Sequence, residues 1–81
     1  MDSIREVGEI VRYHRKRAGL TQQELARLAG IGKTAVFDLE KGKQSIQLDT
    51  LGKILHALNI TIKIESPLMG EYMKQVPGET S

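Results

Sequence analysis

The fold of this chain is decided by residues 21–42, which read TQQELARLAGIGKTAVFDLEKG. Thr21 stands three positions before Glu24, the spacing of a capping box, in which each side chain accepts a hydrogen bond from the other residue's backbone amide. This predicts a short helix that begins after Thr21 and ends at Gly30, since glycine tolerates the left-handed conformation that closes a helix. We expect its inward-facing side chains to be Leu25, Ala26, Leu28 and Ala29.

A second short helix follows after a tight turn. Helical spacing resumes from Lys33 to Lys41, with Val36 and Leu39 on the inner side, and stops at Gly42. Two short helices joined by a turn that contains glycine have the geometry of a helix-turn-helix.

Amphipathic segments flank this pair on both sides. Residues 4–18 predict a helix whose apolar stripe comprises Ile4, Val7, Ile10, Val11 and His14, with His14 as a core or boundary residue. A further helix, ended near Asn59, is marked by Leu48, Leu51, Ile54, Leu55 and Leu58. We therefore expect an all-α domain of four helices over residues 1–59.

Composition narrows the class of protein. The chain has 81 residues and no cysteine, so it has room for one domain and no disulfide or thiolate metal site. Its charged N-terminus resembles no signal peptide, and no apolar run approaches the roughly 20 residues of a membrane span. These features fit a cytoplasmic protein. The formal net charge is +2, and the basic excess lies in the first half, densest at Arg12, Arg15, Lys16 and Arg17.

Catalytic constellations are absent from the sequence. The only histidines, His14 and His56, fall on different predicted helices, and no carboxylates pair at ligand spacing. The glycine-rich places lack a Walker or dinucleotide fingerprint. We therefore predict a protein that is not an enzyme and holds neither a metal nor a cofactor.

The helical segments resemble the Xre/Cro-type repressor family. The resemblance covers residues 4–59 and rests on 21–26, 29–36, 39–42 and 48–58. It implies a lambda-repressor-like domain whose recognition helix, residues 33–41, enters the DNA major groove. It also implies an ion pair between Arg15 and Glu40 that joins the first and third helices.

The same resemblance implies the DNA-contacting residues. The base-reading candidates are Lys33, Thr34, Phe37 and Asp38. Phe37 departs from the family's usual small or polar residue, and it either packs on a thymine methyl or turns into the core. Gly32 is another departure, because it brings no hydroxyl to the cap of the recognition helix. The phosphate candidates are Arg12, Gln22, Gln23, Lys41 and Lys43.

The pattern changes after residue 59. Ile60, Ile62 and Ile64 alternate with polar residues, which predicts a β-strand over residues 60–66, stopped by Pro67. No second alternating run exists to pair with it, so we expect it to pair antiparallel with the same strand of a second copy; the alternative is a frayed extended tail. Residues 67–81 are predicted to be a flexible tail, in which Leu68, Met69, Tyr72 and Met73 give the alternative of a short docking turn.

A strand directly after the fourth helix resembles the HipB-type antitoxins. That resemblance implies a homodimer that represses its own operon at a pseudopalindromic double-stranded DNA operator and binds a HipA-like kinase toxin. Two other functions remain open: a free-standing dimeric Xre-type regulator without a toxin, and an antitoxin that binds protein and no longer binds DNA.

Overall fold

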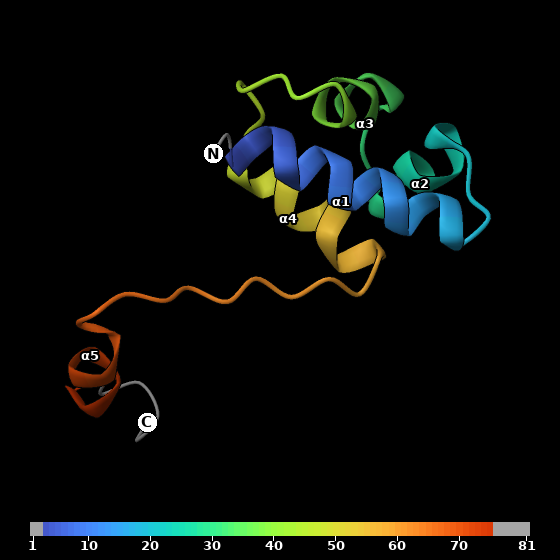
Figure 1. The fold of residues 1–81 in the computed structure, drawn as a ribbon. Coiled ribbons are helices and arrows are strands. Elements are labelled where there is room, and N and C mark those ends of the chain that lie inside the picture. Colours follow the sequence, from blue (N-terminus) through green and yellow to red (C-terminus); the bar gives the residue numbers. More distant parts are fainter. Residues whose placement is uncertain (1–2, 76–81) are drawn as a thin grey trace.

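The structure of the chain, a computed structural model, describes residues 3–75 and contains five α-helices within that range (Figure 1). Their bounds are α1 Ser3–Arg17, α2 Gln22–Ala29, α3 Lys33–Glu40, α4 Leu48–Ala57 and α5 Met69–Gln75. Helices α1 to α4 gather into one body, whereas α5 lies at the end of an extended segment that leads away from it (Figure 1). The prediction of an all-α, four-helix domain is confirmed for this body.

The two ends of α2 form as the sequence predicts. The backbone amide of Glu24 donates to Thr21 Oγ1 at 3.0 Å, and the amide of Thr21 donates to Glu24 Oε1 at 2.8 Å. These hydrogen bonds hold the pKa of Glu24 below its ordinary value. Gly30 closes the helix in the left-handed conformation with φ of 73°. Both signals are local, so they do not depend on the packing of the rest of the chain.

One apolar core joins the four helices of the body. Its buried residues are Val11 from α1, Leu25 and Ala26 from α2, Val36 and Leu39 from α3, and Leu51, Ile54 and Leu55 from α4. Burial of each large aliphatic side chain stabilises the fold by roughly 1.5–3 kcal/mol. The core therefore fixes the turn between α2 and α3 and leaves the opposite face of α3 outward.

The buried face of α1 differs from the predicted stripe. Val7 and Val11 pack inward, but Ile10 is 41% exposed and His14 is also exposed, with its Nδ1 donating to the Ile10 carbonyl oxygen at 2.7 Å. The prediction of His14 as a core or boundary residue was therefore wrong. The reason is Gly8, which lets α1 approach the backbone of α3 and turns the Gly8 side of the helix inward.

The expectation for Leu28 was also wrong. Its side chain is 64% exposed, whereas Leu25 and Ala26 are buried and Ala29 is partly buried. Leu25, Ala26 and Ala29 share one sector of α2 about 100° wide, and Leu28 falls to one side of that sector.

The segment after α4 needs two corrections. Asn59 ends the helix region with φ of 58°, as predicted, but residues 60–66 form no strand within the described chain. Ile60 is partly buried, while Ile62 and Ile64 are 61% and 71% exposed. The physical reason is that strand hydrogen bonds need a neighbouring strand, and the described part of this single chain offers none.

The second correction concerns the predicted flexible tail. Residues 69–75 form α5, in line with the alternative of a short amphipathic turn, and residues 76–81 of that predicted tail lie outside the described residues. The three-and-four spacing of Met69, Tyr72 and Met73 is the signal for this helix.

Substitution of Gly8 tests the close approach of α1 to α3. A Cβ at Gly8 would overlap the carbonyl oxygen of Leu39 and lie 3.1 Å from its carbonyl carbon. We expect Gly8→Ala to lower the free energy of unfolding by about 2 kcal/mol, as overpacking does in a close contact. Urea unfolding followed by circular dichroism measures this loss.

Gly52→Ala is the matched control. Gly52 also lies inside a helix, α4, but a Cβ there meets no atom within 4 Å. This change should stabilise the protein by up to about 1 kcal/mol, since alanine favours the helix over glycine. Equal effects of the two substitutions would show that α1 and α3 do not meet at Gly8.

Candidate nucleic-acid interface

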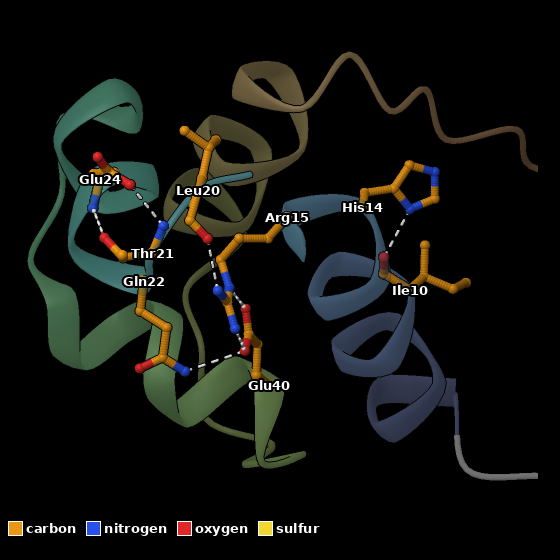
Figure 2. A network of polar contacts seen from close by, with 8 residues as sticks. All are labelled: Ile10, His14, Arg15, Leu20, Thr21, Gln22, Glu24 and Glu40. Carbon is orange, nitrogen blue, oxygen red and sulfur yellow. Dashed lines mark hydrogen bonds and ion pairs between the residues drawn. The ribbon is translucent and has the colours of Figure 1, made fainter. Parts of the chain in front are cut away.

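A buried ion pair joins α1 to α3 (Figure 2). Arg15 Nε donates to Glu40 Oε2 at 2.6 Å and its Nη2 donates to Glu40 Oε1 at 3.0 Å, with side chains only 9% and 3% exposed. The third guanidinium nitrogen, Nη1, donates to the Leu20 carbonyl oxygen at 2.8 Å. Gln22 Nε2, at the start of α2, donates to Glu40 Oε1 at 3.1 Å. The network therefore connects α1, the turn after it, α2 and α3.

The electrostatics of this pair favour its charged form. Burial acts to raise the pKa of Glu40, but hydrogen bonds from Arg15 and Gln22 and the positive charges of Arg15 and Arg12 outweigh it, so this pKa is lowered. The hydrogen bond to Glu40 raises the pKa of Arg15 against the opposing effect of burial. Both groups are therefore ionised at neutral pH, and each compensates the charge of the other.

The outward face of α3 carries the predicted base-reading residues. Lys33 and Thr34, in its first turn, are exposed, and Phe37 is 45% exposed. Of the two alternatives for Phe37, the structure therefore has the outward one. Lys41 Nζ lies 5.0 Å from the centre of the Phe37 ring, and Asp38 Oδ2 lies 3.5 Å from Lys43 Nζ.

The amino end of α2 and the first turn of α3 meet at a shallow depression of about 490 Å³. Three predicted DNA contacts line it: Gln22, Gln23 and Lys33. Arg15, Lys16 and Thr21 also line it, and Lys16 and Thr21 were not among the predicted phosphate contacts. The amino end of a helix attracts anions, because its amide groups and its dipole present positive charge. Lys16 adds an exposed cation to this end.

Gln22 has a second role that the sequence did not reveal. Its amide nitrogen already donates to Glu40, so this side chain is partly buried and held in place. The hydrogen bond to Glu40 therefore fixes the position of this amide at the amino end of α2, where it lines the depression.

A second depression, of about 270 Å³, lies between α3 and the start of α4. The predicted residues Thr34, Asp38 and Lys43 line it together with Ala35, Ser45, Ile46, Gln47 and Thr50. Hydroxyl and amide groups from the loop after α3 therefore stand beside the base-reading face. Arg12 lines neither depression, although its charge acts on Glu40.

Other chemistries find no support in the described residues. Within residues 3–75, no three His, Asp or Glu side chains gather as metal ligands. None of the helices described there has the length and apolar character to cross a membrane. What these residues offer is a small helical body with an exposed, partly basic recognition face.

This arrangement of helices and exposed polar groups defines a helix-turn-helix protein. A helix-turn-helix family model matches residues 11–64, and the chain belongs to this Xre-type family. The family is one of DNA-binding regulators, so the chain is a transcriptional regulator and not an enzyme, as the sequence predicts.

Three curated proteins are similar to this chain. The HTH-type transcriptional regulator y4mF of Sinorhizobium fredii is 39% identical over 62 residues, which cover 76% of this chain and 82% of that protein. An HTH-type transcriptional regulator of Methanothermobacter thermautotrophicus is 43% identical over 49 residues, covering 60% and 71%. The competence pilus inhibition repressor of Acinetobacter baylyi is 35% identical over 57 residues, covering 70% and 52%.

The Arg15–Glu40 pair predicts how stability depends on pH. Because the pKa of Glu40 is lowered in the folded protein, its contribution is complete above the ordinary carboxyl pKa of about 4.3 and is lost as the pH falls through the lowered value. Glu40→Gln leaves Arg15 uncompensated and should cost about 3 kcal/mol at neutral pH. We expect this difference from the wild type to shrink in acid, measured by urea unfolding between neutral and acidic pH.

Glu9→Gln supplies the control, since Glu9 is an exposed carboxylate on α1. Its effect should stay within about 0.5 kcal/mol at every pH. A Glu40→Gln cost that is small at neutral pH, or that does not change in acid, would contradict the role given to the pair.

Proposed function

We propose that this regulator is a homodimeric repressor that reads a pseudopalindromic operator with α3. The observation that carries the proposal is the mounting of α3. Val36 and Leu39 lie in the core, and Glu40 is tied to α1, while the face that bears Lys33, Thr34 and Phe37 is exposed. A recognition helix must be held rigidly if its side chains are to meet base edges in register.

The chemistry of the exposed face fits direct readout of bases. In the first turn of α3, the Lys33 ammonium is a donor for guanine O6 or N7, and Thr34 offers a hydroxyl and a methyl group. Phe37 stands outward, where its ring fits against a thymine methyl. Asp38 accepts from cytosine N4 when it is released from Lys43, and its free carboxylate disfavours wrong bases there.

Phosphate contacts surround this face. Gln23 and the backbone at the amino end of α2 meet one strand of the duplex, and Gln22 takes part through its fixed position. Lys41 and Lys43, at the other end of α3, and Arg12 on α1 supply further cations. Each true phosphate contact releases about one counterion, so binding weakens steeply as salt rises.

The segment after α4 supports the homodimer. Ile62 and Ile64 are exposed in the single chain, and the backbone of residues 60–66 has no strand neighbour in the described chain. Antiparallel pairing with a second copy would satisfy these groups and bury the isoleucines around a two-fold axis. Two recognition helices about 34 Å apart would then meet successive major grooves of a symmetric site.

Repression is the activity named for the similar Acinetobacter baylyi protein. The resemblance to HipB-type antitoxins extends the proposal to an autoregulated operon with a HipA-like kinase toxin. Capture of the neighbouring kinase-like gene product at micromolar concentration is the expected result of a pull-down. Recovery of nothing would leave a free-standing dimeric regulator.

Base and phosphate contacts are separable by substitution. Lys33→Ala should weaken binding to the operator more than binding to random DNA, by about 1–3 kcal/mol at one base position. Arg12→Ala should weaken both alike and reduce the salt dependence by about one counterion. Fluorescence anisotropy titrations at two salt concentrations, with operator and random duplexes, measure both effects.

Lys53→Ala is the control for loss of one positive charge, because Lys53 is exposed on α4 and lines neither depression. Its effect on binding should be small. If Lys33→Ala weakens operator and random DNA by the same factor, Lys33 is a phosphate contact and the assignment of base reading fails.

A charge placed in the proposed dimer segment should separate the copies. Ile62→Lys introduces an ammonium where the isoleucines would meet, so we expect monomers in analytical ultracentrifugation and a parallel loss of operator affinity. Thr61→Lys places the same charge on the alternate side of the segment and should leave the dimer intact. A dimeric Ile62→Lys protein would place the interface elsewhere.

A further inference from the structure

The most unusual element of the described chain is α5, because it is short and has no core contact of its own. It contains seven residues, and none of them is buried. Isolated helices below about 12–15 residues are only marginally stable in water. A helix of this length therefore needs a surface to pack against.

The side chains of α5 indicate an apolar docking face. Leu68, just before the helix, is 66% exposed, and Tyr72 and Met73 are 60% and 57% exposed. Met69, Tyr72 and Met73 fall on one side at three-and-four spacing, whereas Glu71 and Lys74 fall on the other. Helix α5 lies apart from the body formed by α1 to α4 (Figure 1), and Tyr72 and Met73 are exposed there.

We infer that α5 docks on the body of the second copy, at the end of that copy's α4. This inference rests on the proposed homodimer. Antiparallel pairing centred on Ile62 keeps the isoleucines of both copies on one face and sets Ile64 of one copy beside Ile60 of the other. Met69 follows Ile64 by five positions, and these span at most about 18 Å. Helix α5 of one copy must therefore begin close to the carboxyl end of α4 in the other.

That end of α4 offers an apolar surface of suitable character. Ala57, Leu58 and Ile60 pack against the core of their own chain but are only partly buried. Helix α5 would cover their remaining exposed area in the second copy. Each copy would then dock its own α5 on the other copy and bind the α5 of that copy in return, as two-fold symmetry requires.

The buried area favours a second copy with α5 included. Ile62 and Ile64, at 61% and 71% exposed, are only two side chains, whereas a stable interface takes about 20–30 residues from each partner. Leu68, Tyr72 and Met73, at 66%, 60% and 57% exposed, add three apolar side chains. The extended segment alone is therefore too small, and α5 with the residue before it enlarges the apolar part of the interface.

A crosslinking experiment between two single-cysteine variants tests the exchange directly, because the natural chain has no cysteine. Tyr72→Cys is mixed with a size-tagged His56→Cys protein, subunits are exchanged, and the mixture is oxidised. His56 is exposed on the last turn of α4. Any disulfide between the two proteins is intermolecular by design. The inference predicts a disulfide-linked heterodimer on a non-reducing gel.

Lys74→Cys, on the polar side of the same helix, is the matched control and should crosslink to His56→Cys far less. A second measurement avoids cysteine altogether: Met73→Glu should weaken the dimer at least tenfold in analytical ultracentrifugation, whereas Lys74→Glu should not. Neither change touches the core, so the body remains folded.

The results separate this inference from the proposed homodimer. A dimer that crosslinks equally from both sides of α5, or that Met73→Glu does not weaken, overturns the docking of α5 and leaves the homodimer standing. A wild-type protein that is monomeric at micromolar concentration overturns the homodimer and the docking together. Preferential crosslinking at Tyr72 with a weakened Met73→Glu dimer supports both.

Discussion

The structure depends on the contact of Arg15 with Glu40. One guanidinium holds both carboxylate oxygens of Glu40 and the Leu20 carbonyl oxygen, and Gln22 adds a fourth hydrogen bond from the start of α2. Every nitrogen of the guanidinium is therefore used. A charge pair this deeply buried is tolerated only when its partners satisfy it so completely. It joins the carboxyl end of α3 to α1.

This constraint determines how the recognition helix is presented. Helix α3 is short, and its two faces differ in burial: Val36 and Leu39 are fully buried, and Phe37 is nearly half exposed. Gly8 allows α1 to lie directly against the end of α3, so the anchoring contacts come from the side away from the exposed residues. The same network positions Gln22 at the amino end of α2. The proposed base-reading and phosphate-binding groups are thus mounted on one frame.

The local elements of the fold were predictable from the sequence, and the long-range ones were less so. Thr21, Glu24 and Gly30 act within one turn of the chain, and the structure has their hydrogen bonds as predicted. The inward face of α1 was not predictable from periodicity, because the close approach at Gly8 involves residues thirty positions away. The prediction for Leu28 was wrong for a related reason. Hydrophobicity shows which residues can be buried, but the packing of the helices around the core decides which of them are buried.

Some residues of the candidate site were likewise predictable from the sequence, and others were found only in the structure. The family resemblance supplied Lys33, Thr34 and the ion pair, whereas Lys16 and the loop residues Ser45 and Gln47 emerged only from their place beside the depressions. A signal for Lys16 existed, since it directly follows Arg15, whose pairing fixes the rotation of α1. The contacts of the segment after residue 59 could not be predicted from a single chain. Ile62, Ile64 and the apolar side chains of α5 are exposed in the described chain, and the proposed second copy would cover them.

The most direct test of the central claim is a titration of the purified protein onto the DNA upstream of its own gene, with random competitor and at two salt concentrations. We expect saturable binding that survives the competitor, with two protein chains for each site and a weaker affinity at the higher salt. Binding that the competitor abolishes would contradict the claim. It would reduce the interaction with DNA to an effect of charge and make a protein partner the main target.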